Sequence, residues 1–340
     1  MGKWICGDLH THSDCCVDGA VPVLEIVRQA RKWCQFLAIS GHARQSERWG
    51  GEQYAQVLAA RQQFPDFPLF HTAELEFPIP RHVMMITAPE NREFELQSEL
   101  VRRYDRLSGV TGIEQAEDEL AYVAKHWGED CFMVFNHPSA PEVPYAHLKR
   151  LVAVNDVFKI IACVDRRERR AAQIWRIGGA WDRLLAQGFR LYARCGSDFH
   201  RHFSTGGNDY WPGEFAQDYL YVKENSYSEI FNAYRSGNFY CSVGAPIAEP
   251  SFSISADFRV KLSFKVLKPL RKIDIIADQR SVMSFRQVKS DFFFEGYLPP
   301  CRYCRVRGLG ELQKRPYEDG FYEPLFLLNP LFPAGALPCI

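Results

Sequence analysis

Histidines and acids gather in this sequence at the points where short apolar runs end or begin. The stretch CGDLHTHSDCCVDG, residues 6–19, holds two histidines, three aspartates and three cysteines. Five further segments place such residues beside an apolar run, and together the six segments contain His10, His12, Asp18, His42, Glu74, His82, His137, Asp198 and His200. These residue types bind metals or act as acids and bases in enzymes, so they are the first candidates for chemistry.

The spacing of these residues indicates a shared metal centre. His10 and His12, and likewise Asp198 and His200, are two residues apart, so in an extended chain each pair points to one side. The carboxyl ends of strands in a parallel αβ barrel share one face. A single histidine at a strand end is commonly structural, but six segments aimed at one face favour a metal site. Imidazole and carboxylate together suit Zn, Mn or Fe, and two or three such cations would supply a bridging hydroxide for hydrolysis.

The elements that must position these residues alternate between strand and helix patterns. We predict strands at 4–6, 36–40, 69–77, 82–87, 131–138, 156–164 and 190–200, and helices at 22–36, 52–64, 93–107, 115–127 and 168–187. Alternation of this kind predicts an α/β fold with a parallel sheet or barrel.

The pattern changes after about Gly244. Four alternating runs, FRVKLSFKV, KIDIIA, YCRVRGL and PLFLL, follow without a long helical stretch. They predict a small antiparallel β domain, most simply a sandwich. We therefore expect two domains, a hydrolase domain at 1–245 and a β domain at 246–340.

Composition limits the partners. The 41 basic and 41 acidic residues cancel, so a nucleic-acid polymer is not an expected ligand. No run of about eighteen apolar residues and no leader pattern is seen, and we expect a cytoplasmic protein without a membrane partner. The eleven cysteines are scattered, and no other motif offers Cys6, Cys15 or Cys16 a metal partner, so all three are expected to be bystanders.

The combined motifs resemble the PHP (polymerase and histidinol phosphatase) superfamily. DLHTHS matches its first motif, and VDGA, SGH, TAELE, the histidine opening HVMMIT, NHP and GSDFH follow in the family's order across roughly the first 240 residues. The later segments WDRLLAQGFRLYARCGSDFH and SGNFYCSVGAP, with the β domain, are similar to the carbaryl-hydrolase-like (CehA/McbA) branch. One departure is Gly41, where the family usually has an aspartate before the histidine.

The resemblance implies a distorted (β/α)7 barrel of the PHP type, followed here by the antiparallel β sandwich. It also implies up to three divalent metals. His10, His12, Glu74 and Asp198 would hold the first; Glu74, His82 and His137 the second; and Asp18, His42 and His200 the third. Asp8 is a candidate supporting partner for the ligand histidines.

Four further residues near the motifs are candidates for catalysis. Arg166, Arg44 and Arg201 could hold phosphate oxygens, with surface ion pairs as the alternative. His202 could protonate a leaving group.

Three functions remain open at this point. The preferred one is a metal-dependent phosphoesterase acting on a small phosphorylated molecule. The same site could hydrolyse a carbamate or carboxylic ester, or the protein could be a non-catalytic metal-bearing scaffold. The metal's identity, the physiological substrate and the oligomeric state stay open.

Overall fold

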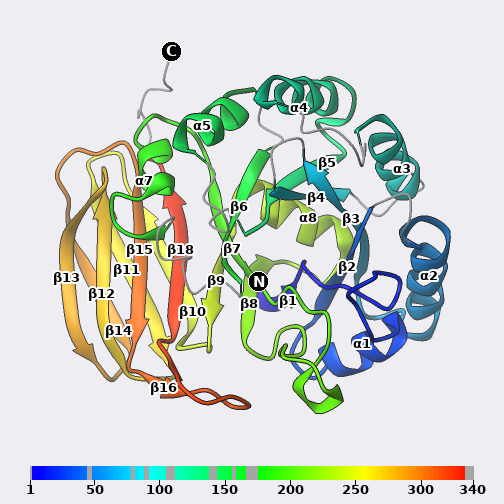
Figure 1. The fold of residues 1–340 in the computed structure, drawn as a ribbon. Helices are drawn as coiled ribbons and strands as arrows, with labels where there is room; N and C mark the ends of the chain where they lie inside the picture. Colours follow the sequence, from blue (N-terminus) through cyan, green and yellow to red (C-terminus); the bar gives the residue numbers. More distant parts are fainter. Residues whose placement is uncertain are drawn as a thin grey trace.

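The protein has a mixed α/β fold built on one large sheet (Figure 1). The structure, a computed structural model, describes residues 2–43, 48–77, 81–87, 92–104, 112–137, 144–154, 158–165 and 175–333. Two of the candidate arginines, Arg44 and Arg166, lie outside these residues. Within the described residues, no helix is both long and apolar enough to cross a membrane.

Thirteen strands form the large sheet, in the order β13-β12-β15-β18-β9-β8-β1-β2-β3-β4-β5-β6-β7. The part of this sheet that precedes residue 245 in the chain has nine strands among the described residues. They are β1 (Lys3–Asp8), β2 (Phe36–His42), β3 (Leu69–Phe77), β4 (Arg81–Thr87), β5 (Cys131–Phe135), β6 (Phe158–Asp165), β7 (Tyr192–Gly196), β8 (Ala216–Val222) and β9 (Phe239–Val243). β1, β2 and β3 are parallel, as are β5, β6 and β7, whereas β4 runs antiparallel to both its neighbours.

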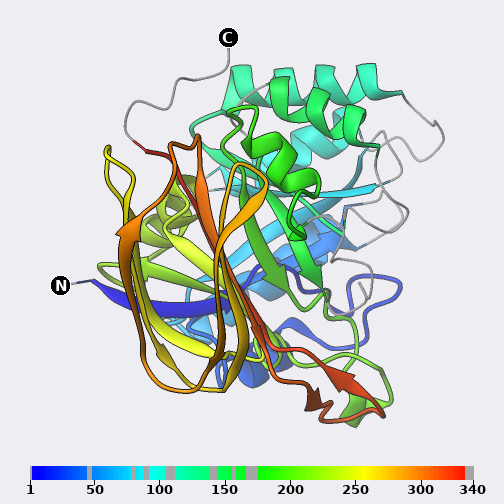
Figure 2. The same ribbon diagram turned by 90° about the vertical axis from the view of Figure 1, so that its left-hand side faces the viewer.

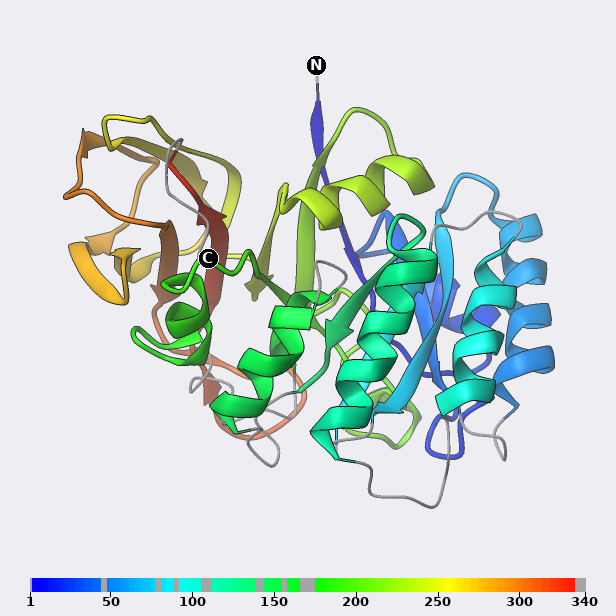
Figure 3. The same cartoon turned by 90° about the horizontal axis from the view of Figure 1, so that it is seen from above.

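Helices cover the part of the sheet formed by β1 to β9 (Figure 3). They are α1 (Val23–Ala30), the π-helix η1 (Trp49–Gln53), α2 (Tyr54–Gln63), α3 (Glu93–Tyr104), α4 (Ile113–Trp127), α5 (Tyr145–Val154) and α8 (Tyr227–Ser236). α7 (Ala180–Leu185) lies beside the C-terminal strands (Figure 1), where its Asp182 pairs with Arg305, and η2 (Phe203–Thr205) is a short 3-10 turn. β2 is buried at every position, as expected for a strand covered on both faces.

Two predicted helices are shorter than expected. α1 ends at Ala30, and the chain turns before β2 begins at Phe36. The prediction of one helix over 168–187 is wrong for its described part, because the chain bends before α7 begins at Ala180. Gly178 has φ +72°, which a right-handed helix does not allow.

The (β/α)7 barrel is not seen as a closed hydrogen-bonded ring among the described strands. β7 ends the sheet, and side chains from neighbouring strands take the hydrogen bonds that a closing strand would make. Asp218 Oδ1 accepts from the backbone N–H of Cys195 at 2.8 Å, and Asn329 Oδ1 accepts from that of Ala193 at 2.7 Å. The edge of β7 is therefore bonded to carboxylate and amide side chains.

The C-terminal strands form two sheets, but one of them continues the central sheet. Its strands are β12 (Leu270–Ala277), β13 (Arg280–Val288), β15 (Cys304–Gly310) and β18 (Leu325–Leu331), and β18 pairs with β9. The second sheet has β10 (Ile247–Ile254), β11 (Arg259–Val266) and β14 (Phe292–Tyr297), and buried apolar side chains join the two. A hairpin of β16 (Gln313–Lys314) and β17 (Phe321–Tyr322) projects from this region (Figure 2). The domain division after residue 245 stays a prediction, since the large sheet runs across it.

Glu119 is an unusual residue in the helical layer. It lies buried on the sheet-facing side of α4, and its Oε1 has no hydrogen-bond partner among the described residues. Burial raises the pKa of this carboxyl to about 9. The folded protein thus holds a proton here at pH values where the unfolded chain has lost it, and stability falls as the pH rises.

We expect Glu119→Gln to stabilise the protein, and to do so more at pH 8 than at pH 5. The neutral amide cannot lose a proton, so its stabilising effect should be larger at pH 8 than at pH 5 by about 4 kcal/mol. Denaturant unfolding at both pH values measures it. Glu95→Gln, at an exposed acid of α3, is the control. Equal pH dependence in wild type and Glu119→Gln would contradict this account.

Candidate metal centre

The structure brings the nine candidate ligands together around one buried carboxylate, Glu74. Its Oε1 lies 3.0 Å from His10 Nε2, 3.3 Å from His82 Nδ1 and 3.4 Å from His137 Nε2. Its Oε2 lies 3.2 Å from His12 Nε2 and 3.3 Å from His42 Nδ1. Five imidazoles therefore contact a single acid.

Potential ligand atoms fall into four overlapping groups. These are His12, Asp18, His42 and His200; His10, His12 and Asp198; His10, Glu74 and His137; and His42, Glu74 and His82. Each group gathers atoms within 4.8 Å of one another. Because the groups share members, the centre is continuous and can hold neighbouring ions.

The sheet explains why these residues meet. His42 and Glu74 are register partners on the parallel strands β2 and β3, so their side chains emerge on the same face. His137 and Asp198 follow the ends of β5 and β7 with φ of 28° and 47°. Non-glycine residues seldom adopt such angles, and they occur preferentially at functional sites.

Asp18 lies on the solvent-exposed side of the cluster. Its Oδ2 lies 3.1 Å from His200 Nε2 and 3.6 Å from His42 Nε2. Just over half of its side chain, 53%, is exposed, whereas those of Glu74 and His12 are buried. The cluster is thus open to solvent at Asp18.

The donor set fits divalent metals. His42 Nδ1, His82 Nδ1 and Glu74 Oε2 are buried and have no hydrogen-bond partner among the described residues, although they stand within 3.3 Å of an opposing ligand atom. The Nε2 atoms of His10 and His12 are 3.1 Å apart. Buried polar atoms are normally satisfied, and lone pairs that converge without aligned hydrogen bonds are what a cation requires.

Electrostatics favour the ligand forms of two central residues. Burial acts to raise the pKa of Glu74, but its interactions with His10 and His82 and its hydrogen bonds with His10 and His12 outweigh burial and hold that pKa well below its usual value. Burial lowers the pKa of His10, although Glu74 and Asp198 oppose the change. An ionised carboxylate and a neutral imidazole both offer lone pairs to a metal.

A buried ion network supports the cluster from behind. Arg194, on β7, donates to Asp8 Oδ1 at 3.1 Å and to Asp218 Oδ2 at 2.9 Å. Asp8 in turn accepts from the backbone N–H of His10 at 2.9 Å and of Ser197 at 2.8 Å. We expected Asp8 to support the rings of the candidate ligand histidines. Its carboxylate instead accepts from backbone N–H groups in the two segments that carry His10 and Asp198.

Sequence reasoning missed Arg194. The available signal was a charged residue within the otherwise apolar run LYARC. Charged residues are almost never fully buried unless they are paired. A buried strand therefore required acids facing Arg194, and Asp8 was already a candidate.

The side chain of Gln53 lies against Gly41, the glycine at which the family usually has an aspartate. A Cβ on Gly41 would lie 2.0 Å from Gln53 Oε1, so an aspartate at this position would require the Gln53 side chain to move. The Gln53 side chain is fully buried, and its amide has no hydrogen-bond partner among the described residues. The space beside Gly41 in the SGH motif is thus occupied by a glutamine side chain from η1.

The described catalytic candidates make contacts within the loop after β7. His202 Nε2 lies 3.2 Å from Glu214 Oε2, and its Nδ1 accepts from the backbone N–H of Ser204 at 3.0 Å. Tyr317, between β16 and β17, donates to Glu214 Oε1, and Figure 2 shows that hairpin beside the loop. Arg201 Nε donates to the carbonyl of Thr205. Catalytic roles for His202 and Arg201 stay predictions.

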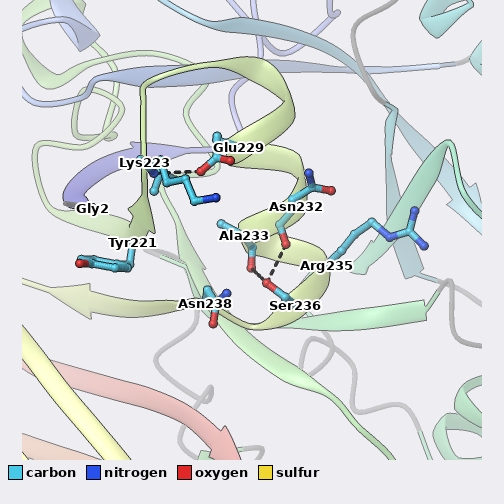
Figure 4. Close-up of a pocket in the computed structure, with 10 residues that line it drawn as sticks. Gly2, Tyr221, Lys223, Glu229, Asn232, Ala233, Arg235, Ser236 and Asn238 are labelled. Atoms are coloured by element: carbon cyan, nitrogen blue, oxygen red, sulfur yellow. Dashed lines mark hydrogen bonds between the residues drawn. The ribbon is translucent and has the colours of Figure 1, made fainter.

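A separate pocket of about 660 Å³ lies beside α8 (Figure 4). It is lined by residues that include Gly2, Lys223 and Arg235. Gly2 precedes β1, whereas His10 follows it, so the pocket and the ligand cluster lie at opposite ends of that strand. None of the four ligand groups includes a residue of this pocket.

Comparisons with known proteins return solved structures only, since neither a family model nor a curated protein matches the sequence. One is a two-domain protein from Bacteroides vulgatus that contains a predicted PHP-like metal-dependent phosphoesterase, with 15% identity, 95% of each chain covered and a TM-score of 0.49. Another is a candidate metal-dependent phosphoesterase from Bifidobacterium adolescentis, with 15% identity, 67% and 95% covered and a TM-score of 0.40. A third is endonuclease Q with a 27-mer duplex, with 14% identity, 69% and 57% covered and a TM-score of 0.46.

We expect Arg194→Met to destabilise the protein strongly, by about 3–5 kcal/mol, because it leaves two buried carboxylates without their counter-ion. Denaturant unfolding measures the change. Arg150→Met is the control, since Arg150 also pairs with two acids, Glu114 and Glu117, but on the exposed surface. Its unfolding midpoint should match the wild type. Equal losses in both variants would refute the role of burial.

Proposed function

We propose that this protein is a metal-dependent hydrolase of the PHP type, with a preference for phosphoesters. The observation that carries the proposal is the gathering of five imidazoles around the buried Glu74 carboxylate. Histidine and carboxylate ligands are those of hydrolytic Zn, Mn and Fe sites. The proposal extends the motif resemblance of the sequence to the site itself.

The proposed ligand assignment follows the overlapping groups. His10, His12 and Asp198 would hold one ion together with Glu74, and His82 and His137 would hold a second through the other contacts of Glu74. Asp18, His42 and His200 would hold a third. His12 lies within the same group as this last set, so it is placed to link the first and third positions.

Bound divalent ions would supply Lewis-acid charge and lower the pKa of water at neutral pH. The protein's own residues would balance the charge of these ions and position them. Glu74 balances the positive charge while remaining buried, and Asn136 fixes that carboxylate by donating to Oε1 at 2.7 Å. Asp18, on the open side, faces the incoming substrate.

Support for a phosphoester comes from the number of adjoining ligand groups. Phosphoryl transfer requires charge compensation at both the attacking and the leaving oxygen, which sites with two or more ions provide. A small phosphorylated molecule is the proposed substrate class. Hydrolysis of a carbamate or carboxylic ester by the same centre is the competing outcome of the test.

The first experiment is a substrate panel on protein of known metal content. After loading with Mn, Zn or Fe, we expect turnover of p-nitrophenyl phosphate or its bis-ester, and loss of turnover in chelator. Turnover of a naphthyl carbamate alone would replace the phosphoester proposal with the ester one. Full activity in chelator from protein without bound metal would overturn the hydrolase mechanism.

A substitution tests the ligand cluster directly. His10→Ala should lower kcat/KM by at least roughly 100-fold, or about 2.7 kcal/mol of transition-state stabilisation, because it removes a proposed metal ligand. His126→Ala, at an exposed histidine of α4, is the control and should retain activity. Circular dichroism checks that both variants remain folded. Equal activity of the two variants would count against His10 as a ligand.

A further inference from the structure

Cys16 lies directly behind two of the proposed ligands. Its Sγ is 3.6 Å from His12 Nδ1 and accepts from the backbone N–H of His42 at 3.3 Å. The side chain is buried, with 4% of the residue exposed. One sulfur atom thus contacts the ring of one ligand and the main chain of another.

The two nitrogens of the His12 ring face different surroundings. Nε2 points toward the cluster, 3.2 Å from Glu74 and 3.3 Å from Asp198. Nδ1 points away from it, toward Cys16. A histidine that offers Nε2 to a metal carries its proton on Nδ1, and the partner of that proton fixes the tautomer and the orientation of the ring.

The usual partner of such a nitrogen is an oxygen, and His200 illustrates this arrangement. His200 Nδ1 lies 2.8 Å from the backbone carbonyl of Asp198. At the equivalent place behind His12 stands a thiol, which is a weaker and longer hydrogen-bond partner. The two proposed ligands His12 and His200 therefore differ in the atom that faces Nδ1.

We propose that Cys16 is a positioning residue of the metal centre: its sulfur accepts from His12 Nδ1–H and from the His42 backbone, and so holds both ligands in register. This inference rests on the proposed function. It revises the expectation that all three cysteines of CGDLHTHSDCCVDG are bystanders. The sulfur acts through His12 and His42 and touches no substrate.

The neighbouring Cys15 provides a matched control. It is also buried, one position away in the same loop, but its Sγ contacts Asp14 and Gln56 rather than a proposed ligand. Loss of either sulfur removes a comparable buried volume. Only loss of the Cys16 sulfur removes a hydrogen-bond partner from the ligand residues.

The test measures metal affinity in full-length Cys16→Ala, Cys16→Ser and Cys15→Ala. Competition with a chromophoric chelator gives the dissociation constants for Mn²⁺ and Zn²⁺, and thermal unfolding of chelator-treated protein reports on packing. We expect Cys16→Ala to weaken affinity by about 10- to 100-fold. The Ser variant should recover part of this loss, since a hydroxyl also accepts hydrogen bonds, and Cys15→Ala should bind as the wild type does.

Two results would overturn the inference alone: wild-type affinity in Cys16→Ala, or equal losses of affinity in Cys16→Ala and Cys15→Ala. The second result would assign the effect to packing. A wild-type protein that binds neither metal would instead overturn the proposed function, and this inference with it. The two failures are therefore distinguishable in one set of titrations.

Discussion

A buried negative charge at Glu74 is the constraint on which the centre depends. An ionised carboxylate in a protein interior is costly unless it is paired and hydrogen-bonded. Here histidines from several strand ends, together with Asn136, face its two oxygens. The strands that carry these partners must end at the same level, so the position of one carboxylate fixes the register of much of the sheet.

Behind the candidate ligands lies a buried positive charge, Arg194, which also requires partners of opposite charge. Arg194 is fully buried, and its two acids lie on β1 and β8. Because Asp8 also accepts from the backbone amides of His10 and Ser197, the ion network reaches the segments after β1 and β7 that carry candidate ligands. The same carboxylate, Asp8, therefore balances the charge of Arg194 and positions the segments that carry candidate ligands.

Much of the strand pattern could be predicted from the sequence, because apolar runs such as FLAIS and CFMVF are long enough to identify buried strands. The convergence of the histidines could be predicted as well, since strand ends share a face. The break at Gly178 was overlooked although the sequence signals it, because the adjacent glycines 178 and 179 favour a turn and Gly178 adopts a positive φ. The pairing of Gly41 with Gln53 could not be predicted, since it depends on how η1 packs against β2. The open edge of β7 depends on Asp218 and Asn329, residues distant in sequence whose side chains give no local signal.

The pairing of β18 with β9 has a consequence for how this chain can be divided. If the chain were cut after residue 245, β9 would keep β8 on one side and present bare backbone N–H and C=O groups on the other. Exposed edges of this kind recruit other strands and lead to aggregation. The last strands of the chain therefore act as the cover of a sheet edge belonging to the first part, and recombination with other proteins would require a replacement strand at that edge.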